Sequence, residues 1–256
     1  MENKSILSLE NIKLSYTTNS NDMLEVIKDI TISINEHEIV ALLGPSGCGK
    51  SSLLNIISGE ENNFKGKINF KSSNNSNYNN CEFGFLFQKP ILFNWLTVKE
   101  NIAFGLKVRK VKKKEREELI KEYIKSVGLN GFENYYPNEL SGGMQQRVAL
   151  ARILILKPYL LLMDEPFAAL DTQLRHKMQQ LVLKLWQEHK QSIVFVTHDI
   201  EEAIIISHRI YILSSRPSYV VSEIEVPFKN KQDTSYIDTY EFIQLKNEIK
   251  NILVSC

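Results

Sequence analysis

The chain has 256 residues, 43% of them hydrophobic, and a formal net charge of +1. This length and composition suffice for one domain with a full core and a subdomain, and a charge so close to zero supplies no field that would attract nucleic acid. The longest apolar stretches, 153–156 and 160–163, are far below the roughly 20 residues that span a bilayer, and no signal segment opens the chain, so we expect a cytoplasmic protein that meets a membrane only through a partner.

The first predicted elements are strands. Apolar and polar residues alternate at 6–12 and at 30–34, which indicates half-buried antiparallel strands. A further strand is expected at 65–70. The serine- and asparagine-rich tract 72–80 that follows predicts a loop.

A glycine-rich loop comes between these strands. Residues 44–51 read Gly-Pro-Ser-Gly-Cys-Gly-Lys-Ser and lie between an apolar run at 39–43 and a helical pattern from Ser52 onward. A strand, such a loop and a helix in this order predict a phosphate-binding loop. Backbone N–H groups and the helix N-terminus attract phosphate, Lys50 adds a full charge, and Ser51 is expected to ligate Mg²⁺. The alternative is a plain glycine-rich turn, which the flanking strand and helix argue against.

Cys48 lies inside this loop. The helix N-terminus and Lys50 both favour a thiolate, so we expect a lowered pKa for Cys48. The alternative is that the position only accommodates a small side chain. Cys81 and Cys256 show no paired spacing, and all three cysteines are expected to be reduced thiols.

The pattern from about 91 to 156 is helical and predicts a separate lobe. Within it, 107–116 is rich in Lys and Arg and is followed at once by Glu117 and Glu118. Contact with anionic lipid headgroups is one interpretation of this run. The mixed charges of the helix that follows favour a solvated face instead.

A second donor loop precedes a helix expected at 144–156. Residues 140–147 read Leu-Ser-Gly-Gly-Met-Gln-Gln-Arg, so the loop offers backbone donors and a helix N-terminus to an anion without a lysine. Both loops could serve one ATP within a chain. Alternatively, two chains pair about a two-fold axis and each site takes one loop from each chain.

Two buried-strand runs end in polar side chains. The run 160–163 ends at Asp164 and Glu165, and the run 192–197 ends at His198. Ligands of open parallel sheets bind at this edge. We expect Asp164 to hold Mg²⁺ and Glu165 to accept a proton from the water that attacks the γ-phosphate. His198 is expected to contact that phosphate and to orient Glu165 or the water, although a lone histidine is usually structural. Helices at 172–190, 199–207 and 239–253 and a strand at 219–226 complete the chain.

The order and spacing of these motifs resemble the ATPase subunit of an ABC transporter. The matching segments are 44–51, Gln88 within 85–90, 140–147, 160–166, 169–171 and His198. They extend over nearly the whole chain. The resemblance implies an α/β fold of the P-loop NTPase type, with a mixed β-sheet core, an antiparallel β subdomain and an inserted helical subdomain. The implied boundaries are a nucleotide-binding core at 1–90 and 157–226, a helical subdomain at 91–156 and a C-terminal helical tail at 227–256.

The resemblance also implies a homodimer that encloses two ATP molecules, in which Ser141 and Gly143 of one subunit close on the γ-phosphate held by the other. Tyr16 would stack on adenine, although an aromatic residue at a strand end commonly only packs. Asp171 would cross the dimer interface, and Gln88 would sense the transporter. The implied ATP-binding residues are Tyr16, Gly44, Pro45, Ser46, Gly47, Cys48, Gly49, Lys50, Ser51, Ser52, Ser141, Gly142, Gly143, Gln145 and Asp171. The implied Mg²⁺ ligands are Ser51, Gln88 and Asp164, and the implied catalytic residues are Glu165, His198 and Gln88.

Within the family, the segments 91–101, 212–217 and 224–227 look like the branch that imports nitrate, sulfonates, taurine and bicarbonate. This resemblance implies import of a small solute through a separate integral-membrane permease, with an external solute-binding protein and no nucleic acid. The ATPase would lie on the cytoplasmic face of the cell membrane, attached through the permease. Phe93, Trp95 and Leu96 are candidates for a groove that holds a permease helix, with ordinary lobe core as the alternative.

Three other functions are alternatives to transport-linked ATP hydrolysis by an importer. A non-transport ABC ATPase that acts on nucleic acid or ribosomes usually has two fused cassettes or a long coiled coil, and this chain has one cassette without sustained heptads. A nucleotide sensor without turnover would lack Glu165 or His198, and both are present. Exporter ATPases are frequently fused to membrane spans, and none is predicted here.

Overall fold

The computed structural model describes residues 5–17, 21–70, 83–168, 170–228 and 234–256. The tract 72–80, Cys81 and the alanine of the 169–171 motif lie outside these residues. The strands are β1 (Ser5–Thr17), β2 (Met23–Asn35), β3 (Ile39–Leu43), β4 (Phe64–Phe70), β5 (Phe83–Leu86), β6 (Leu160–Asp164), β7 (Ser192–Thr197), β8 (Arg209–Leu213) and β9 (Ser218–Glu225). The helices are α1 (Lys50–Ser58), α2 (Val98–Val108), α3 (Lys113–Ser126), α4 (Gly142–Leu154), α5 (Thr172–His189), α6 (Ile200–Ile206) and α7 (Tyr240–Val254), with 3₁₀ turns η2 (Pro137–Glu139) and η3 (Thr234–Asp238).

The strands form one sheet of mixed direction, in the order β4-β1-β2-β9-β8-β3-β7-β6-β5. β3 pairs in parallel with β7 and β8, and β6 pairs in parallel with β5 and β7. β1 pairs antiparallel with β2 and β4. Because β3, β6 and β7 run in the same direction, the residues that follow them meet at one edge of the sheet, as the sequence predicted.

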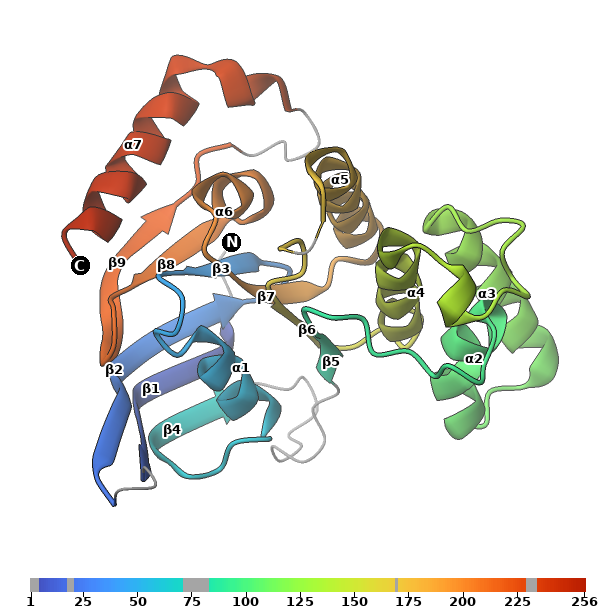
Figure 1. Ribbon diagram of the computed structural model, residues 1–256, viewed down its shortest axis with the longest axis horizontal. Helices are drawn as coiled ribbons and strands as arrows, with labels where there is room; N and C mark the ends of the chain where they lie inside the picture. Colours follow the sequence, from blue (N-terminus) through green and yellow to red (C-terminus); the bar gives the residue numbers. More distant parts are fainter. Residues whose placement is uncertain (1–4, 18–20, 71–82, 169, 229–233) are drawn as a thin grey trace.

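Alternate residues of β3 face two different cores. Ile39 and Leu43 pack in a cluster with residues of α4, α5 and α6, whereas Val40 and Leu42 pack against Leu53 and its neighbours on α1. This alternation follows from the period of two in a strand. In Figure 1, α1 and the antiparallel strands lie on one side of the parallel strands, and α5, α6 and α7 lie on the other.

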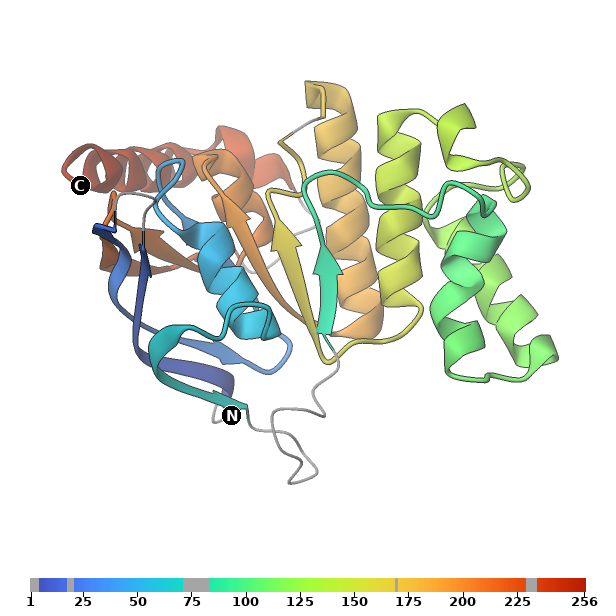
Figure 2. The same ribbon diagram turned by 60° about the horizontal axis from the view of Figure 1, so that its bottom comes forward.

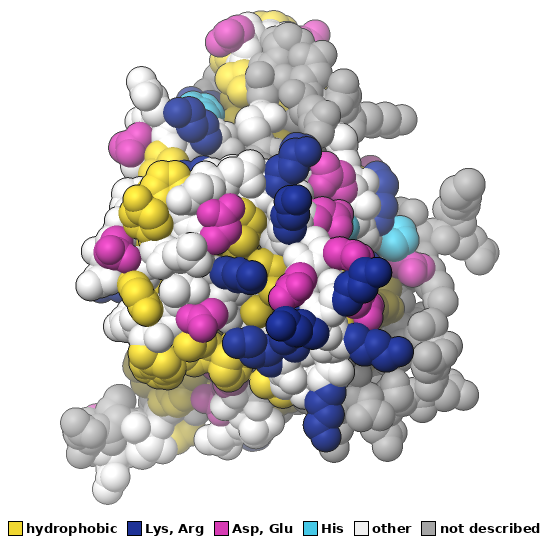
Figure 3. Space-filling view, turned by 90° about the vertical axis from the view of Figure 1, so that its right-hand side faces the viewer, with side chains coloured by type: hydrophobic (Ala, Val, Ile, Leu, Met, Phe, Trp, Pro, Cys, Tyr) yellow, Lys and Arg dark blue, Asp and Glu magenta, His cyan; other side chains and the backbone are white. Residues whose placement is uncertain are grey.

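Helices α2, α3 and α4 form a lobe beyond β5 and β6, here called the helical lobe (Figures 1 and 2). Thr97 caps the start of α2 in a capping box: its hydroxyl accepts from the Glu100 backbone N–H, and the Glu100 carboxylate accepts from the Thr97 backbone N–H. On the outer face of the lobe, Lys and Arg side chains are interspersed with Asp and Glu (Figure 3). This distribution favours a solvated face for the basic run at 107–116.

Most of the expected elements are confirmed. The strand before the phosphate loop, the strands ending at Asp164 and Thr197, and the three later helices all form within two residues of the expected positions. The two antiparallel strands also form, but β1 extends five residues beyond the expected 6–12 and β2 begins seven residues before the expected 30–34. α4 begins at Gly142, earlier than expected, because the hydroxyl of Ser141 caps it. β5 and β8 were not predicted. No helix in the described ranges is both long and apolar enough to cross a membrane.

Candidate active site

The phosphate loop occupies the turn from β3 into α1. Gly47 and Gly49 have φ angles of 77° and 106°, in the region that favours glycine. A Cβ on Gly49 would lie 2.9 Å from Val26 Cγ1, and one on Gly44 would lie 2.9 Å from the Leu213 carbonyl oxygen. The close approach of neighbouring elements therefore favours glycine at positions 44 and 49, and the turn itself favours glycine at positions 47 and 49.

Lys50 is 5% exposed, and its Nζ donates to the carbonyl oxygens of Gly44 at 2.8 Å and Pro45 at 2.9 Å. The Lys50 side chain therefore folds back onto the first residues of the phosphate loop. A phosphate oxygen carries more negative charge than these carbonyls and is a stronger acceptor for the same ammonium group.

The carboxylate at the end of β6 reaches the start of α1. Ser51 Oγ donates to Asp164 Oδ1 at 3.0 Å. Burial raises the pKa of Asp164 and the charge of Glu165 adds to this, while the Ser51 hydrogen bond and Lys50 oppose it. A hydroxyl and a partly desolvated carboxylate side by side are the oxygen ligands that suit Mg²⁺, so the residues fit the expected ion.

Glu165 lies between Gln88, which follows the end of β5, and His198, which follows the end of β7. Its φ of 40° is unusual for a residue with a side chain and costs of order 1–3 kcal/mol. One carboxylate oxygen lies 3.3 Å from His198 Nδ1, and Gln88 Nε2 donates to the other at 3.5 Å. The Glu165 side chain is 21% exposed and that of His198 52% exposed. The structure therefore brings the three expected catalytic residues together at the sheet edge that carries the phosphate loop.

Tyr16 lies beside the phosphate-loop helix. Its hydroxyl donates to Glu61 Oε2 at 3.0 Å. The ring is 38% exposed, so a face remains available for a ligand. Partial burial raises the pKa of Tyr16, and Glu61 adds to the effect while Ser52 opposes it.

The second donor loop is built on the start of α4. Ser141 Oγ accepts from the Met144 backbone at 3.4 Å, and Gln145 Nε2 donates back to Pro137 and Leu140 carbonyls. Asp171 caps α5 by accepting from the Leu174 backbone at 3.0 Å. In both ribbon views β6 and β5 separate α4 from α1 (Figures 1 and 2). The fold keeps the two loops apart within one chain.

Gly143 touches α5 closely. A Cβ there would lie 2.2 Å from Leu174 Cδ2, whereas one on Gly142 would meet nothing within 4 Å. Gln146, buried on the same helix, donates to the Pro166 carbonyl at 3.2 Å. α4 is thereby joined to the segment that follows Glu165.

The expectation for the Cys48 thiol was wrong. Cys48 is 1% exposed, and burial raises its pKa more than the charges of Lys50 and Arg216 lower it. Its side chain packs in the cluster formed by α1 and the antiparallel strands. Desolvation disfavours the thiolate and outweighs the helix N-terminus.

Arg216 was missed as a neighbour of the phosphate loop. Its Nε and Nη2 donate to the Gly47 carbonyl at 3.1 and 2.5 Å. The sequence signal at this position is an Arg-Pro pair that follows the end of β8 after two intervening residues.

An apolar groove lies between the sheet and the helical lobe. It has a volume of about 270 Å³, and Phe93, Phe104 and Arg152 help to line it. The rings of Phe93 and Phe104 are 4.5 Å apart, and the Arg152 guanidinium lies 5.2 Å from the Phe93 ring centre. Trp95 is 5.5 Å from Phe93 and 73% exposed, so this residue is not lobe core, whereas Phe93 and Leu96 are half-buried.

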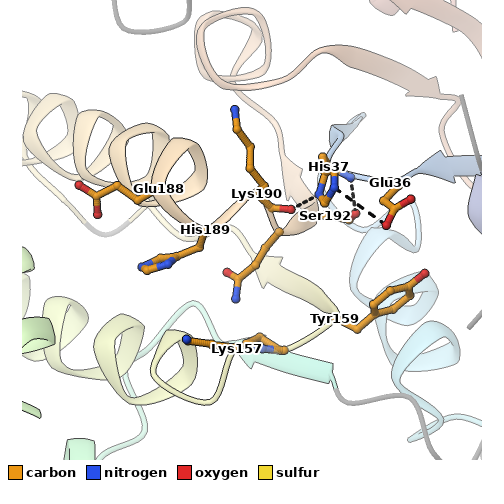
Figure 4. A pocket seen from close by; sticks show the side chains of 10 residues that line it. Glu36, His37, Lys157, Tyr159, Glu188, His189, Lys190 and Ser192 are labelled. Carbon is orange, nitrogen blue, oxygen red and sulfur yellow. Dashed lines mark hydrogen bonds and ion pairs between the residues drawn. The ribbon is translucent and has the colours of Figure 1, made fainter. Parts of the chain in front are cut away.

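A cavity of about 400 Å³ lies elsewhere, beneath the opposite edge of the sheet (Figure 4). His37, Tyr159 and Ser192 come from the starts of β3, β6 and β7, so the cavity is remote from the phosphate loop. Lys157 comes shortly after the end of α4, and His189 is the last residue of α5. The helix dipole explains basic side chains near helix C-termini, and this cavity is not the nucleotide site.

Comparison with known proteins agrees with this geometry. The family model described as ABC transporter matches residues 27–168. An uncharacterised ABC transporter ATP-binding protein of Methanocaldococcus jannaschii is 40% identical over 96% of this chain and 91% of its own length. A taurine import ATP-binding protein of Pelagibacter ubique is 42% identical over 86% of this chain and 82% of its own. A nitrate import ATP-binding protein of Synechocystis is 40% identical over 89% of this chain and 87% of its own.

A solved structure also matches closely. It is the dimeric, post-hydrolysis state of an ATP-binding cassette bound to ADP and Pi, with a TM-score of 0.74 and 33% identity. The match covers 87% of this chain and 99% of that one.

Proposed function

This chain belongs to the ABC transporter family and is an ATPase of that family, and we propose that it powers import of a small oxyanion-bearing solute through a separate permease. The contact that best supports a role driven by ATP turnover is that of Glu165 with Gln88 and His198, which a module that only senses nucleotide would not need. Homologues named as taurine, sulfonate and nitrate import proteins suggest the substrate class. These three solutes share a small size and an anionic sulfonate or nitrate group.

We propose that Glu165 is the general base for hydrolysis. Its carboxylate is held from both sides by Gln88 and His198, which limits its rotation. A base with a fixed direction can accept a proton from water in line with the γ-phosphate. His198, half exposed, is placed to contact that phosphate and to keep Glu165 aimed.

Lys50 and the backbone of 44–51 would hold the phosphates, and Tyr16 would stack on the base. Ser51 and Asp164 are our candidates to hold Mg²⁺, with Gln88 as a further ligand. The ion would neutralise charge on the β- and γ-phosphates. Ser51 and Asp164 are already in contact at 3.0 Å, so little rearrangement is needed to present both oxygens.

We propose that the working unit is a homodimer. Within one chain β5 and β6 separate the loop at 141–143 from the phosphate loop (Figure 1). Pairing two chains about a two-fold axis would give each site the Ser141, Gly142 and Gly143 donors of the other chain. Gln145 would brace that loop through its bonds to η2, and Asp171 would lie near the interface.

The apolar groove between the sheet and the helical lobe is our candidate for the permease contact. Trp95 and Phe104 are large apolar side chains exposed at its rim. The groove's lining residues flank Gln88 in the chain, with Phe85 before it and Ile91 after it, so a change in the groove could be transmitted to the catalytic carboxylate. The chain would then lie on the cytoplasmic face of the membrane, held there by the permease, with an external binding protein that selects the solute.

The proposal is tested by purifying tagged Glu165→Gln from native membranes with MgATP and identifying the proteins that accompany it. Recovery of a multi-span permease and a solute-binding protein is the expected result. Recovery from the soluble fraction with ribosomes or nucleic acid would contradict transport. Lys50→Ala, treated in the same way, is the control for partners held independently of ATP.

A further inference from the structure

We propose that Arg216 is a positioning residue for the phosphate loop: it holds the Gly47 carbonyl so that the Cys48 N–H faces the phosphate. Arg216 lies in the bend 214–217 between β8 and β9, distant in sequence from the loop. The inference deepens the ATP site proposed above and rests on it.

The contact is a forked, charge-assisted hydrogen bond. Nε and Nη2 of Arg216 both donate to the Gly47 carbonyl, at 3.1 and 2.5 Å. In a trans peptide the carbonyl and the next N–H point in opposite directions. Because Arg216 fixes the Gly47 carbonyl on the side of the loop that faces Arg216, the Cys48 N–H is directed to the opposite side.

The Lys50 ammonium group, the other donor of the loop, lies on the same side as the Cys48 N–H. The Cys48 N–H donates to the Pro45 carbonyl at 3.4 Å, and Lys50 Nζ donates to the same oxygen at 2.9 Å. These two donors converge on one acceptor position. A phosphate oxygen that approaches beside the Pro45 carbonyl would compete with it for both donors.

The bend that carries Arg216 is anchored independently of the loop. Ser214 N donates to the Tyr219 carbonyl at 3.0 Å, and Tyr219 N donates to Ser214 Oγ at 3.1 Å. Ser218 Oγ donates to the Val26 carbonyl at 3.2 Å, which ties the start of β9 to β2. The backbone of the bend that carries the Arg216 guanidinium is therefore held in place by its own hydrogen bonds.

Such a clamp acts on binding because the loop is rich in glycine. Glycines leave the backbone free to adopt several conformations, and ordering them opposes ligand binding. A charged donor on the carbonyl also polarises the peptide and strengthens its N–H. Arg216 does not contact Glu165 or His198 in the described contacts, so the proton-transfer step is not changed directly.

The test compares Arg216→Ala, Arg216→Lys and Lys250→Ala. Lys250 is an exposed cation on α7, and its removal controls for the loss of one charge. Equilibrium dialysis gives the Kd for ATP and ADP, and steady-state assays of the full chain give KM and kcat. Arg216→Ala is expected to raise Kd and KM about tenfold, the scale of one charge-assisted hydrogen bond, with kcat changed less than about threefold.

Arg216→Lys keeps one charged donor and should recover part of the affinity, which distinguishes positioning from a general structural role. Unchanged nucleotide affinity in Arg216→Ala, or a loss of kcat without a change in KM, overturns the inference while leaving the ATPase assignment intact. A parent chain that binds neither nucleotide would instead overturn the proposed function. Equal affinities of the Lys and Ala variants would also contradict the forked-donor role.

Discussion

His198 Nδ1 lies 3.3 Å from Glu165 Oε1, and this contact joins the ends of two neighbouring parallel strands. Each residue comes directly after the last paired residue of its strand, so the pairing of that strand alone does not fix the direction of its side chain. Gln88 holds the second carboxylate oxygen at 3.5 Å. A carboxylate with both oxygens engaged is oriented before any substrate arrives, which is the property that a general base requires.

Replacing Glu165 with Gln should lower kcat by about 10²–10⁴-fold, because the amide cannot accept the proton from water. ATP binding should persist, since Lys50 and the phosphate loop are untouched. Size-exclusion chromatography with MgATP should then show a trapped dimer. Glu188→Gln, an exposed carboxylate on α5, is the matched control. Hydrolysis by Glu165→Gln near the parent rate would remove Glu165 from the role of base.

Gly143 and Gly142 provide a matched pair for the start of α4. A Cβ on Gly143 would lie 2.2 Å from Leu174 Cδ2, whereas one on Gly142 meets nothing within 4 Å. In Gly143→Ala the Leu174 side chain must move, and this cost offsets the gain in helix propensity, so the variant should be less stable than Gly142→Ala by about 1 kcal/mol. Gly142→Ala should leave the free energy of unfolding unchanged or raise it by up to about 1 kcal/mol through helix propensity. Urea unfolding without nucleotide measures both, and equal midpoints would contradict the close contact of α4 with α5.

The sequence predicted the elements that carry local signals. The phosphate loop has its own spacing, and the apolar runs before Asp164 and His198 end in residues that cannot continue a buried strand. β5 is four residues long and contains Gly84, and β8 follows α6 after two residues. Neither has the length or alternation by which a strand is recognised.

Contacts between distant segments could not be predicted. Arg216 and Gly47 are 169 residues apart in the chain, and no periodicity links them. The Cys48 prediction failed for the same reason, since its burial is produced by the packing of α1 against strands from elsewhere. The motif indicated that a thiol lies in the loop, and only the fold determines whether that thiol faces water.

Trp95→Ala should abolish recovery of the permease proposed above while leaving ATP affinity unchanged. The side chain is 73% exposed beside Phe93, and large exposed aromatic residues often dominate interface energy. The measurement is co-purification from membranes, in the Glu165→Gln background with MgATP. Tyr240→Ala, which removes another exposed aromatic residue from α7, is the control. Undiminished recovery with Trp95→Ala would exclude this residue from the permease contact.

Tyr123 provides a pH test of the packing between the helical lobe and its neighbours. Burial raises the pKa of Tyr123 to about 12, with smaller contributions from the charges of Glu122 and Glu188. Because the folded pKa lies above the unfolded value of about 10, the stabilisation is complete below pH 10 and is lost as pH rises through about 12.

Tyr123→Phe removes that titration. At pH 8 the variant should be less stable by about 1 kcal/mol, because the Tyr123 hydroxyl donates to the Leu154 carbonyl at 3.1 Å. Between pH 10 and 12 the parent should lose stability more steeply, so the difference between the two proteins should shrink. Urea unfolding from pH 8 to 11.5 measures this difference, with Tyr240→Phe as the exposed control. Curves for parent and Tyr123→Phe that stay parallel across this range would show that the fold does not hold the Tyr123 proton, and that the hydroxyl faces water when α3 and α4 are packed.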